Sequence, residues 1–205
     1  PLDPPVESSI TPNLLTESIS ASFDNVYING NLTTAYEDFD SYTSINDIDW
    51  SKWNWHDNAT IQRDNGNGWL VLDIGNSVGR ANGQLNFANP SSINEIRADI
   101  TINSTSSDAP RAEIAGTWCH NGVGDIFAKI TVTRDGVYYS VSQEYINEQE
   151  TYKWDELINE NWLTGYIVDA PVTVGISWND ATSTLTFTAD GTSIPYVVSG
   201  NLGPP

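Results

Sequence analysis

The stretch that decides the fold class is DIFAKITVT (residues 125–133), followed by RDG (134–136) and VYYSV (137–141). The two flanking runs are rich in β-branched and aromatic residues, which favour extended strands. Asp135 and Gly136 stand between them, and an Asp-Gly pair between two strands is a strong short-range hairpin signal. The stretch therefore predicts an antiparallel β-hairpin.

Similar short runs recur on both sides of this hairpin, and turn residues separate them. The other runs are GWLVLDI (68–74), IRADITI (96–102), VTVGISW (172–178), TLTFT (184–188) and IPYVV (194–198). Helical patterns do not alternate with these runs, so parallel βαβ units are not expected. We predict an all-β protein built as an antiparallel β-sandwich.

One segment shows a helical pattern instead. Within residues 147–163, Trp154, Leu157, Ile158 and Trp162 stand at positions i, i+3, i+4 and i+8. Apolar side chains at this spacing line one face of an α-helix. We therefore expect one short amphipathic helix in this segment.

The N-terminal region differs from the rest in being proline-rich at its start and free of Lys and Arg. Ile19, Ala21 and Phe23 alternate with polar residues, which predicts one strand. We divide the chain into an extended arm (1–35) and a β-sandwich domain (36–205). Two destinations fit the strand: its own sandwich, or the sheet of a neighbouring subunit. The second, repeated head to tail, joins subunits into a filament.

The charge of the chain excludes several partners. Eight basic residues stand against 27 acidic ones, for a formal net charge of -19. Such a chain repels nucleic-acid phosphates and anionic lipid, so neither nucleic-acid binding nor membrane-surface binding is expected. The apolar runs are also too short to insert into a bilayer. The chain starts at Pro1 and contains no methionine. We interpret it as a mature extracellular or cell-surface protein whose signal peptide has been removed.

Both ends of the strand-rich region resemble a known fold family, the concanavalin A-like lectin/glucanase jelly roll. The segments that carry the resemblance are YEDF (36–39), WSKW (50–53) and WLVL (69–72) at its opening, and VTVGISW (172–178), Phe187 and Asp190-Gly191 at its final hairpin. The resemblance covers roughly residues 36–198. It implies a jelly-roll sandwich, and it implies function only weakly because this fold carries many activities.

The catalytic motifs of enzymes that resemble this fold are not complete here. Glucan hydrolases of the family carry Glu-x-Asp-x-x-Glu on one strand, and no such triplet occurs. Polysaccharide lyases with a similar jelly roll use an Arg-x-Glu strand, a Gln-x-His strand and a Tyr-rich strand. Arg111 and Glu113 imitate the first of these, and the others are absent. We therefore expect a protein that is not an enzyme, with a lyase or glycosidase as the least favoured alternative.

Tryptophans are the better indication of binding, because sugar rings stack on exposed aromatic faces. Trp50, Trp53 and Trp55 stand close together next to Asp57, and Trp154 lies in a second polar segment. We take Trp53, Trp55, Asp57 and Trp154 as candidate glycan-binding residues. The competing interpretation is that large aromatic side chains fill the core, and we favour it for at least two of the first three tryptophans.

Calcium is the metal that the composition favours, because it binds hard oxygen ligands. Glu37, Asp38 and Asp40 crowd one short segment and are the candidate ligands. The competing interpretation is that a chain with 27 acidic residues forms such clusters by chance.

Three functional hypotheses follow, in this order. The first is a structural or adhesive surface protein whose subunits self-associate through the arm. The second is a lectin-like module that binds a polysaccharide. The third is a polysaccharide-active enzyme. The first hypothesis predicts that deleting residues 1–35 abolishes assembly while the remaining domain still folds.

Overall fold

The computed structural model describes residues 13–17, 20–30, 33–73, 80–87, 92–103, 111–147, 149 and 151–203. The fold is an all-β sandwich of two antiparallel sheets with seven strands each. Sheet A has the order β11 (Tyr152–Thr164), β10 (Val137–Ile146), β9 (Asp125–Thr133), β8 (Arg111–His120), β1 (Asn13–Glu17), β6 (Arg80–Leu85) and β3 (Trp53–Asp57). Sheet B has the order β14 (Thr192–Val197), β13 (Thr184–Ala189), β12 (Val172–Asn179), β7 (Glu95–Ile102), β2 (Ser20–Ile28), β5 (Asn67–Asp73) and β4 (Ala59–Asp64).

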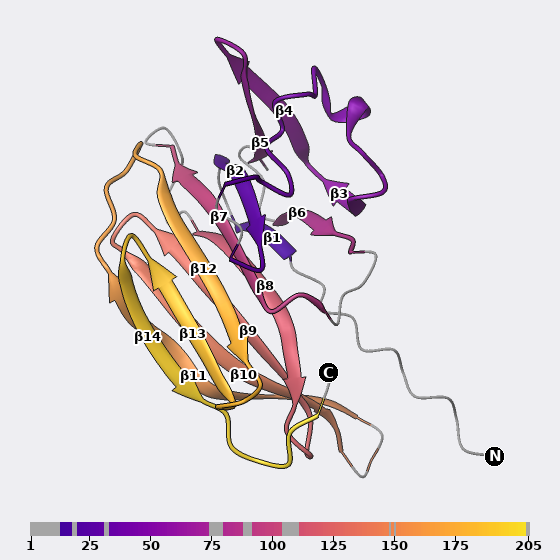
Figure 1. The fold of residues 1–205 in the computed structure, drawn as a ribbon, viewed down its shortest axis with the longest axis vertical. Coiled ribbons are helices and arrows are strands. Elements are labelled where there is room, and N and C mark those ends of the chain that lie inside the picture. The colour runs from indigo at the N-terminus through magenta and orange to yellow at the C-terminus, as the bar shows by residue number, and fades with distance from the viewer. Residues whose placement is uncertain are drawn as a thin grey trace, which may run out of the picture.

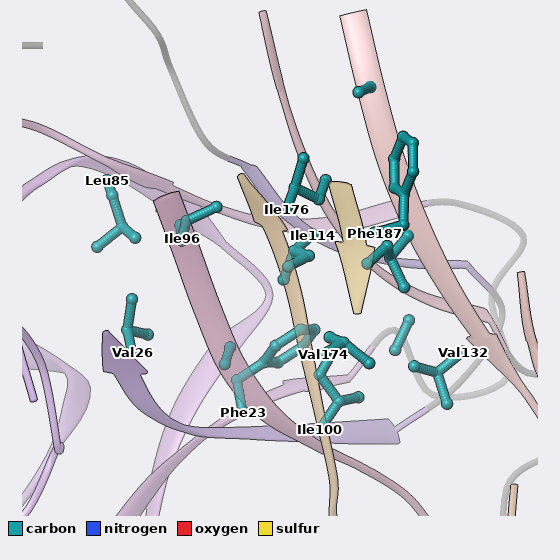
Figure 2. Close-up of a cluster of buried hydrophobic side chains, with 14 of the residues drawn as sticks. Phe23, Val26, Leu85, Ile96, Ile100, Ile114, Val132, Val174, Ile176 and Phe187 are labelled. Carbon is teal, nitrogen blue, oxygen red and sulfur yellow. The ribbon is translucent and has the colours of Figure 1, made fainter. Parts of the chain in front are cut away.

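The two sheets enclose the core. In Figure 1, strands β12–β14 lie over β9–β11 in one half of the molecule, and β3–β5 gather at the opposite end. Side chains alternate along each strand, so that Ile96, Ala98 and Ile100 of β7 are fully buried while their neighbours are only partly so. Figure 2 shows Phe23 and Ile100 of sheet B in one cluster with Ile114 of sheet A.

The hairpin predicted from residues 125–141 is confirmed. Strands β9 and β10 pair antiparallel, with Val132 opposite Val137 across the turn. The inward side chains of β9 are buried, and its outward side chains are polar or aromatic. This alternation places one face of the hairpin in the core and leaves the other to form the outer surface of sheet A.

The predicted arm, for which one strand was expected, forms two strands, and each lies inside one of the two sheets. Strand β1 pairs with β8 and β6, and β2 pairs with β7 and β5. The side chains of Ala21 and Phe23 are fully buried, whereas Ile19 lies outside the described residues. The chain also pairs across the predicted boundary, since Tyr36 N donates to Val26 O at 2.7 Å. Among the described residues up to 35 there is thus no arm separate from the sandwich.

The short helix predicted within residues 147–163 is wrong, because the segment forms strand β11 and pairs with β10 along its length. The helical spacing does not give Trp154, Ile158 and Trp162 a common face in the strand. Trp154 and Trp162 pair with Glu144 and Tyr138, whereas Ile158 pairs with the buried Val141 between two register shifts. Pairing with β10 therefore decides the conformation of the segment. The one helical turn that the described residues contain is the 3-10 segment Ile45–Asp47.

Within the described residues, no helix has the length and apolar character needed to cross a membrane.

Candidate functional site

The outer face of sheet A carries a row of polar and aromatic side chains that crosses four strands. Strand pairing aligns Glu113 of β8 with Thr131 of β9, Thr131 with Tyr138 of β10, and Tyr138 with Trp162 of β11. Partners in a register stand on the same face, so these four side chains share the outer surface. The face is therefore built by the β8–β11 meander.

A buried carboxylate anchors this row. Glu113 is only 4% exposed, and its Oε1 accepts hydrogen bonds from Lys129 Nζ and Thr131 Oγ1, both at 2.9 Å. Arg111 Nη2 lies 3.9 Å from the same oxygen. A buried charge is tolerated when it is paired and hydrogen-bonded. These interactions therefore hold the side chains of Glu113, Lys129 and Thr131 in place on the outer side of sheet A.

An irregularity in β11 brings a second carboxylate to the same arginine. Glu160 has φ 36°, which is uncommon for a residue with a side chain, and its N–H donates to Ser140 Oγ at 3.3 Å. The β10–β11 register shifts on either side of Val141, as expected around a β-bulge. The Glu160 carboxylate pairs with the Arg111 guanidinium. Arg111 thus lies between two carboxylates, one buried and one exposed.

Trp162 is an exposed aromatic surface at one end of the row. Its side chain is 53% exposed, and its ring meets that of Tyr138 edge to face at 5.4 Å between centroids. A Cβ atom added to Gly136 would lie 2.3 Å from the Trp162 ring, so the hairpin turn needs glycine here for the indole to pack. Tyr138 and Gly136 together hold the indole in place with one side open to solvent.

Trp154 is a second such surface on the same face. It is 46% exposed and packs against the Phe127 ring at 5.2 Å. Trp154 and Trp162 pair with Glu144 and Tyr138, which are six positions apart on β10, and this corresponds to roughly 20 Å along an extended strand. Each tryptophan therefore rests on an aromatic residue of a neighbouring strand, and the two stand far enough apart to contact different parts of one extended ligand.

A small polar groove lies along β11, and Trp154 is one of its lining residues. Its volume is about 110 Å³, and its polar lining residues are Lys129, Ser140, Ser142, Glu156, Asn159 and Glu160. Hydroxyl, amide, ammonium and carboxylate groups provide both donors and acceptors. A groove that one tryptophan lines, with mixed hydrogen-bonding groups along it and a second exposed tryptophan further along the strand, suits a hydroxyl-rich ligand.

The other candidate glycan-binding residues lie away from this groove. Trp53 is 1% exposed, so the role predicted for it is wrong: a buried ring cannot stack on a sugar. Trp50 is 57% exposed and stacks on His56 at 5.4 Å. Trp55 and Asp57 belong to β3, but their side chains lie outside the described part of the structure.

The three candidate calcium ligands do not converge. Glu37 is 1% exposed, and it accepts hydrogen bonds from Tyr42 Oη at 2.8 Å and Trp53 Nε1 at 3.2 Å. Asp38 and Asp40 are exposed, and each accepts a backbone N–H. Within the described ranges, no three His, Cys, Asp or Glu side chains form a group that could hold a metal ion. The segment is instead a hydrogen-bonded turn around one buried carboxylate.

The single thiol is not arranged for catalysis. Cys119 is buried, and burial raises the pKa of its thiol to about 12, so at neutral pH it is protonated and unreactive. The adjacent His120 accepts a hydrogen bond from Gly122 N at 3.0 Å through its Nδ1 atom. The surroundings of Cys119 and His120 are therefore those of structural residues and not those of a catalytic pair.

Sequence reasoning found Trp154 but missed Trp162 and the groove. Trp162 was assigned to the apolar face of a helix, although Tyr138 and Gly136, its two contacts, belong to the hairpin that was predicted correctly. Arg111 and Glu113 were noted only as an incomplete lyase motif. What links them to the groove is their pairing with Lys129 and Glu160, which line it and which lie outside the motif.

Comparisons of the chain with protein-family models, with curated proteins and with solved structures found no match.

Proposed function

We propose that this protein is an exported, non-catalytic module that binds glycan chains along the outer face of sheet A. The observation that carries the proposal is the pair of exposed tryptophans on β11: Trp154 lines a polar groove, and Trp162 lies beyond the groove on the same strand. Aromatic residues are enriched at binding surfaces because they bury a large area at a low cost in conformational entropy. The concanavalin A-like resemblance of the sequence is compatible with this role.

The charges around the groove favour a neutral glycan. Lys129 is bound to Glu113, and Arg111 is bound to Glu160, so both cations are already compensated. Glu156 adds a further carboxylate to the lining. An anionic polysaccharide would meet an acidic surface on a chain of net charge -19. Neutral glucans, xylans or mannans are therefore the ligand class that we propose.

The groove is proposed to bind without catalysis because Arg111 engages Glu160, so Glu156, the other carboxylate that lines the groove, has no free carboxyl partner there. Hydrolysis by a carboxylate pair requires a free acid and a free base or nucleophile on either side of the scissile bond. Glu113 is held by Lys129 and Thr131, and Glu160 by Arg111. Both carboxylates are therefore better suited to fixing side chains than to moving protons.

Substitution of the tryptophans tests the proposal. Trp154→Ala and Trp162→Ala should each weaken binding of soluble β-glucan, xylan or mannan by roughly tenfold, because each removes one stacking surface worth about 1.4 kcal/mol. The measurement is affinity electrophoresis across the polysaccharide panel, followed by calorimetry with the best ligand. The same samples are assayed for release of reducing ends, which we expect to be absent.

Trp50→Ala is the matched control, because Trp50 is equally exposed but lies outside the groove. It should leave binding unchanged. If the wild-type chain binds no polysaccharide of the panel, or if all three variants bind as the wild type does, the proposal fails. Turnover by the wild type would contradict the non-catalytic part.

A structural role through strand exchange is the second candidate, and the positions of β1 and β2 favour it. Each occupies the middle of a sheet, so a chain that lacks them would leave a vacant strand position in both sheets. A vacant position of this kind accepts a strand from another subunit through main-chain hydrogen bonds. Self-association through the N-terminal strands is therefore proposed as an alternative to their intramolecular pairing, and glycan binding is compatible with either.

A further inference from the structure

The outer face of sheet B carries a second row of side chains, on the side of the sandwich opposite to the groove. Strand pairing aligns Gln62 of β4 with Trp69 of β5, Asp24 of β2 with Asp99 of β7, and Asp99 with Thr173 of β12. Phe23 pairs with Leu70, which places the next residue, Asp24, beside Trp69. The row therefore crosses five strands of the sheet.

Two carboxylates face each other in the middle of this row. A bulge in β2 gives Asn25 φ 47°, and its N–H donates to Asp24 Oδ1 at 2.8 Å while its side-chain amide donates to Asp99 Oδ2 at 3.1 Å. Thr173 Oγ1 donates to Asp99 Oδ1 at 2.6 Å. Within the described residues, Asp24 Oδ2 receives no such bond, so one carboxylate oxygen remains available as an acceptor.

The electrostatics of Asp24 agree with this geometry. Burial raises the pKa of its carboxyl to about 6, with smaller contributions from Asp99 on β7 and from Asp40 and Asp38 in the following loop. Since its ordinary value is 3.8, the folded state binds the proton more tightly than the unfolded state does. The ionised form therefore destabilises the fold, and it does so fully above a pH of about 6.

Asp24→Asn should for this reason stabilise the protein at neutral pH. The expected gain is roughly tenfold in the folding equilibrium constant, after the shift is discounted for solvent screening of a partly exposed group. The gain should disappear as the pH falls from about 6 to below 3.8. Urea unfolding at several pH values measures it, with the exposed Asp135→Asn as a control for the change in net charge. A gain that is independent of pH would contradict the assignment.

A cavity of about 430 Å³ lies over the row. Among its lining residues are Ser22, Asp24, Gln62, Trp69, Asp99 and Thr101. Its volume falls in the range of small-molecule sites, roughly 300–1,000 Å³. The hydroxyl and amide groups act as both donors and acceptors, the carboxylates act as acceptors, and Trp69 provides an apolar ring. These lining groups suit a ligand that both donates and accepts hydrogen bonds, as sugar hydroxyls do.

We propose that the pocket over Asp24, Asp99 and Trp69 is a second ligand site, which takes one or two neutral sugar residues. An anionic ligand would meet the two carboxylates, and a simple cation would leave the hydroxyl and amide donors without a partner. The pocket is larger than the groove on sheet A, at about 430 Å³ against about 110 Å³. One module with sites on both outer faces can bridge two glycans. This inference does not depend on the groove binding anything.

The test follows the indole N–H signal of Trp69 by NMR during titration with glucose, galactose, mannose, fucose, N-acetylglucosamine and glucosamine. A neutral sugar should shift this signal. Trp69→Ala removes this signal, so its binding is measured by calorimetry and should be weaker by tenfold or more. Asp99→Asn should weaken binding severalfold. Gln62→Ala changes an exposed side chain on the edge strand β4, so it should also weaken binding severalfold without affecting the fold.

The control is the double variant Trp154→Ala/Trp162→Ala, which should retain wild-type affinity in the pocket. The two proposals therefore fail separately, since one is read at Trp69 and the other at the groove tryptophans. The inference is overturned if no neutral sugar shifts the Trp69 signal up to the solubility limit. Preferential binding of glucosamine over glucose would overturn the assignment to neutral sugars.

Discussion

A chain that begins at Tyr36 is expected to lose its cooperative fold. Removing β1 opens sheet A between β8 and β6, and removing β2 opens sheet B between β7 and β5. The backbone groups of four central strands then lose their partners, and the core loses Ala21, Phe23 and Val26. Domains are stabilised by only about 5–15 kcal/mol in total, and the loss of Phe23 alone costs about 3–5 kcal/mol. The truncated chain should therefore lack a thermal transition by calorimetry and by near-UV circular dichroism.

Point variants keep this prediction testable if the truncated chain is insoluble. Phe23→Ala should lower the free energy of unfolding by about 3–5 kcal/mol, because the ring is fully buried between the sheets. Ser22→Ala changes the adjacent residue, which faces outward, and should stay within about 0.5 kcal/mol of the wild type. A truncated chain with a full cooperative transition would show that residues 36–205 form an independent domain.

Adding the missing segment as a peptide separates the two destinations of the N-terminal strands. A peptide of residues 1–35 should restore the fold of the truncated chain, and the same peptide with Phe23→Asp should not, because it would bury an uncompensated charge. Restoration by the peptide shows that the sheets accept these strands in trans, as assembly by strand exchange requires. If the full-length chain is monomeric by light scattering at every concentration, the strands act only within their own sandwich.

Glu37→Ala should be the most damaging single change of a charged residue. The buried carboxylate accepts hydrogen bonds from Tyr42 Oη, Trp53 Nε1 and Phe39 N, and Lys52 Nζ lies at 3.7 Å. Its removal leaves these donors unpaired in the core and opens a cavity beside Trp53. The expected loss is about 3–5 kcal/mol, which urea unfolding measures.

Asp38→Ala provides the matched control, because Asp38 is the next residue and was grouped with Glu37 as a calcium ligand. Its exposed side chain accepts one local N–H, so its removal should cost about 0.5 kcal/mol or less. Both variants are measured with calcium and with a chelator. Equal losses for the two variants that appear only with calcium present would restore the metal site and contradict the hydrogen-bonding role of Glu37.

Strands could be predicted from the sequence where the turn residues and the strand pairing favour the same structure. Asp135-Gly136 predicted the β9–β10 hairpin because the turn and its two strands are neighbours in sequence, so local preference and tertiary pairing coincide. The segment 152–164 was assigned to a helix because its apolar residues, among them Trp154, Ile158 and Trp162, have helical spacing. Its conformation depends on pairing with β10, and the spacing of apolar residues within β11 does not reveal this pairing.

The candidate sites were less predictable than the strands. Trp53 and Trp154 are chemically equivalent in the sequence, yet the first is buried and the second exposed, because β3 turns Trp53 into the core towards Glu37. Asp24 and Asp99 are 75 residues apart, and only the register of β2 with β7 makes them neighbours. Strand register sets such pairs, and a shift of one residue would turn both to the opposite face.

The amino-acid sequence by itself determined the all-β class, the hairpin turns and the acidity, because these follow from local preference and from summed charge. Tertiary structure decided three things: that β1 and β2 complete the two sheets, that Trp162 is exposed, and that a pocket forms over Asp24 and Asp99. Each depends on which strands are neighbours. In an antiparallel sandwich that order arises from contacts between residues far apart in sequence, which no local pattern records.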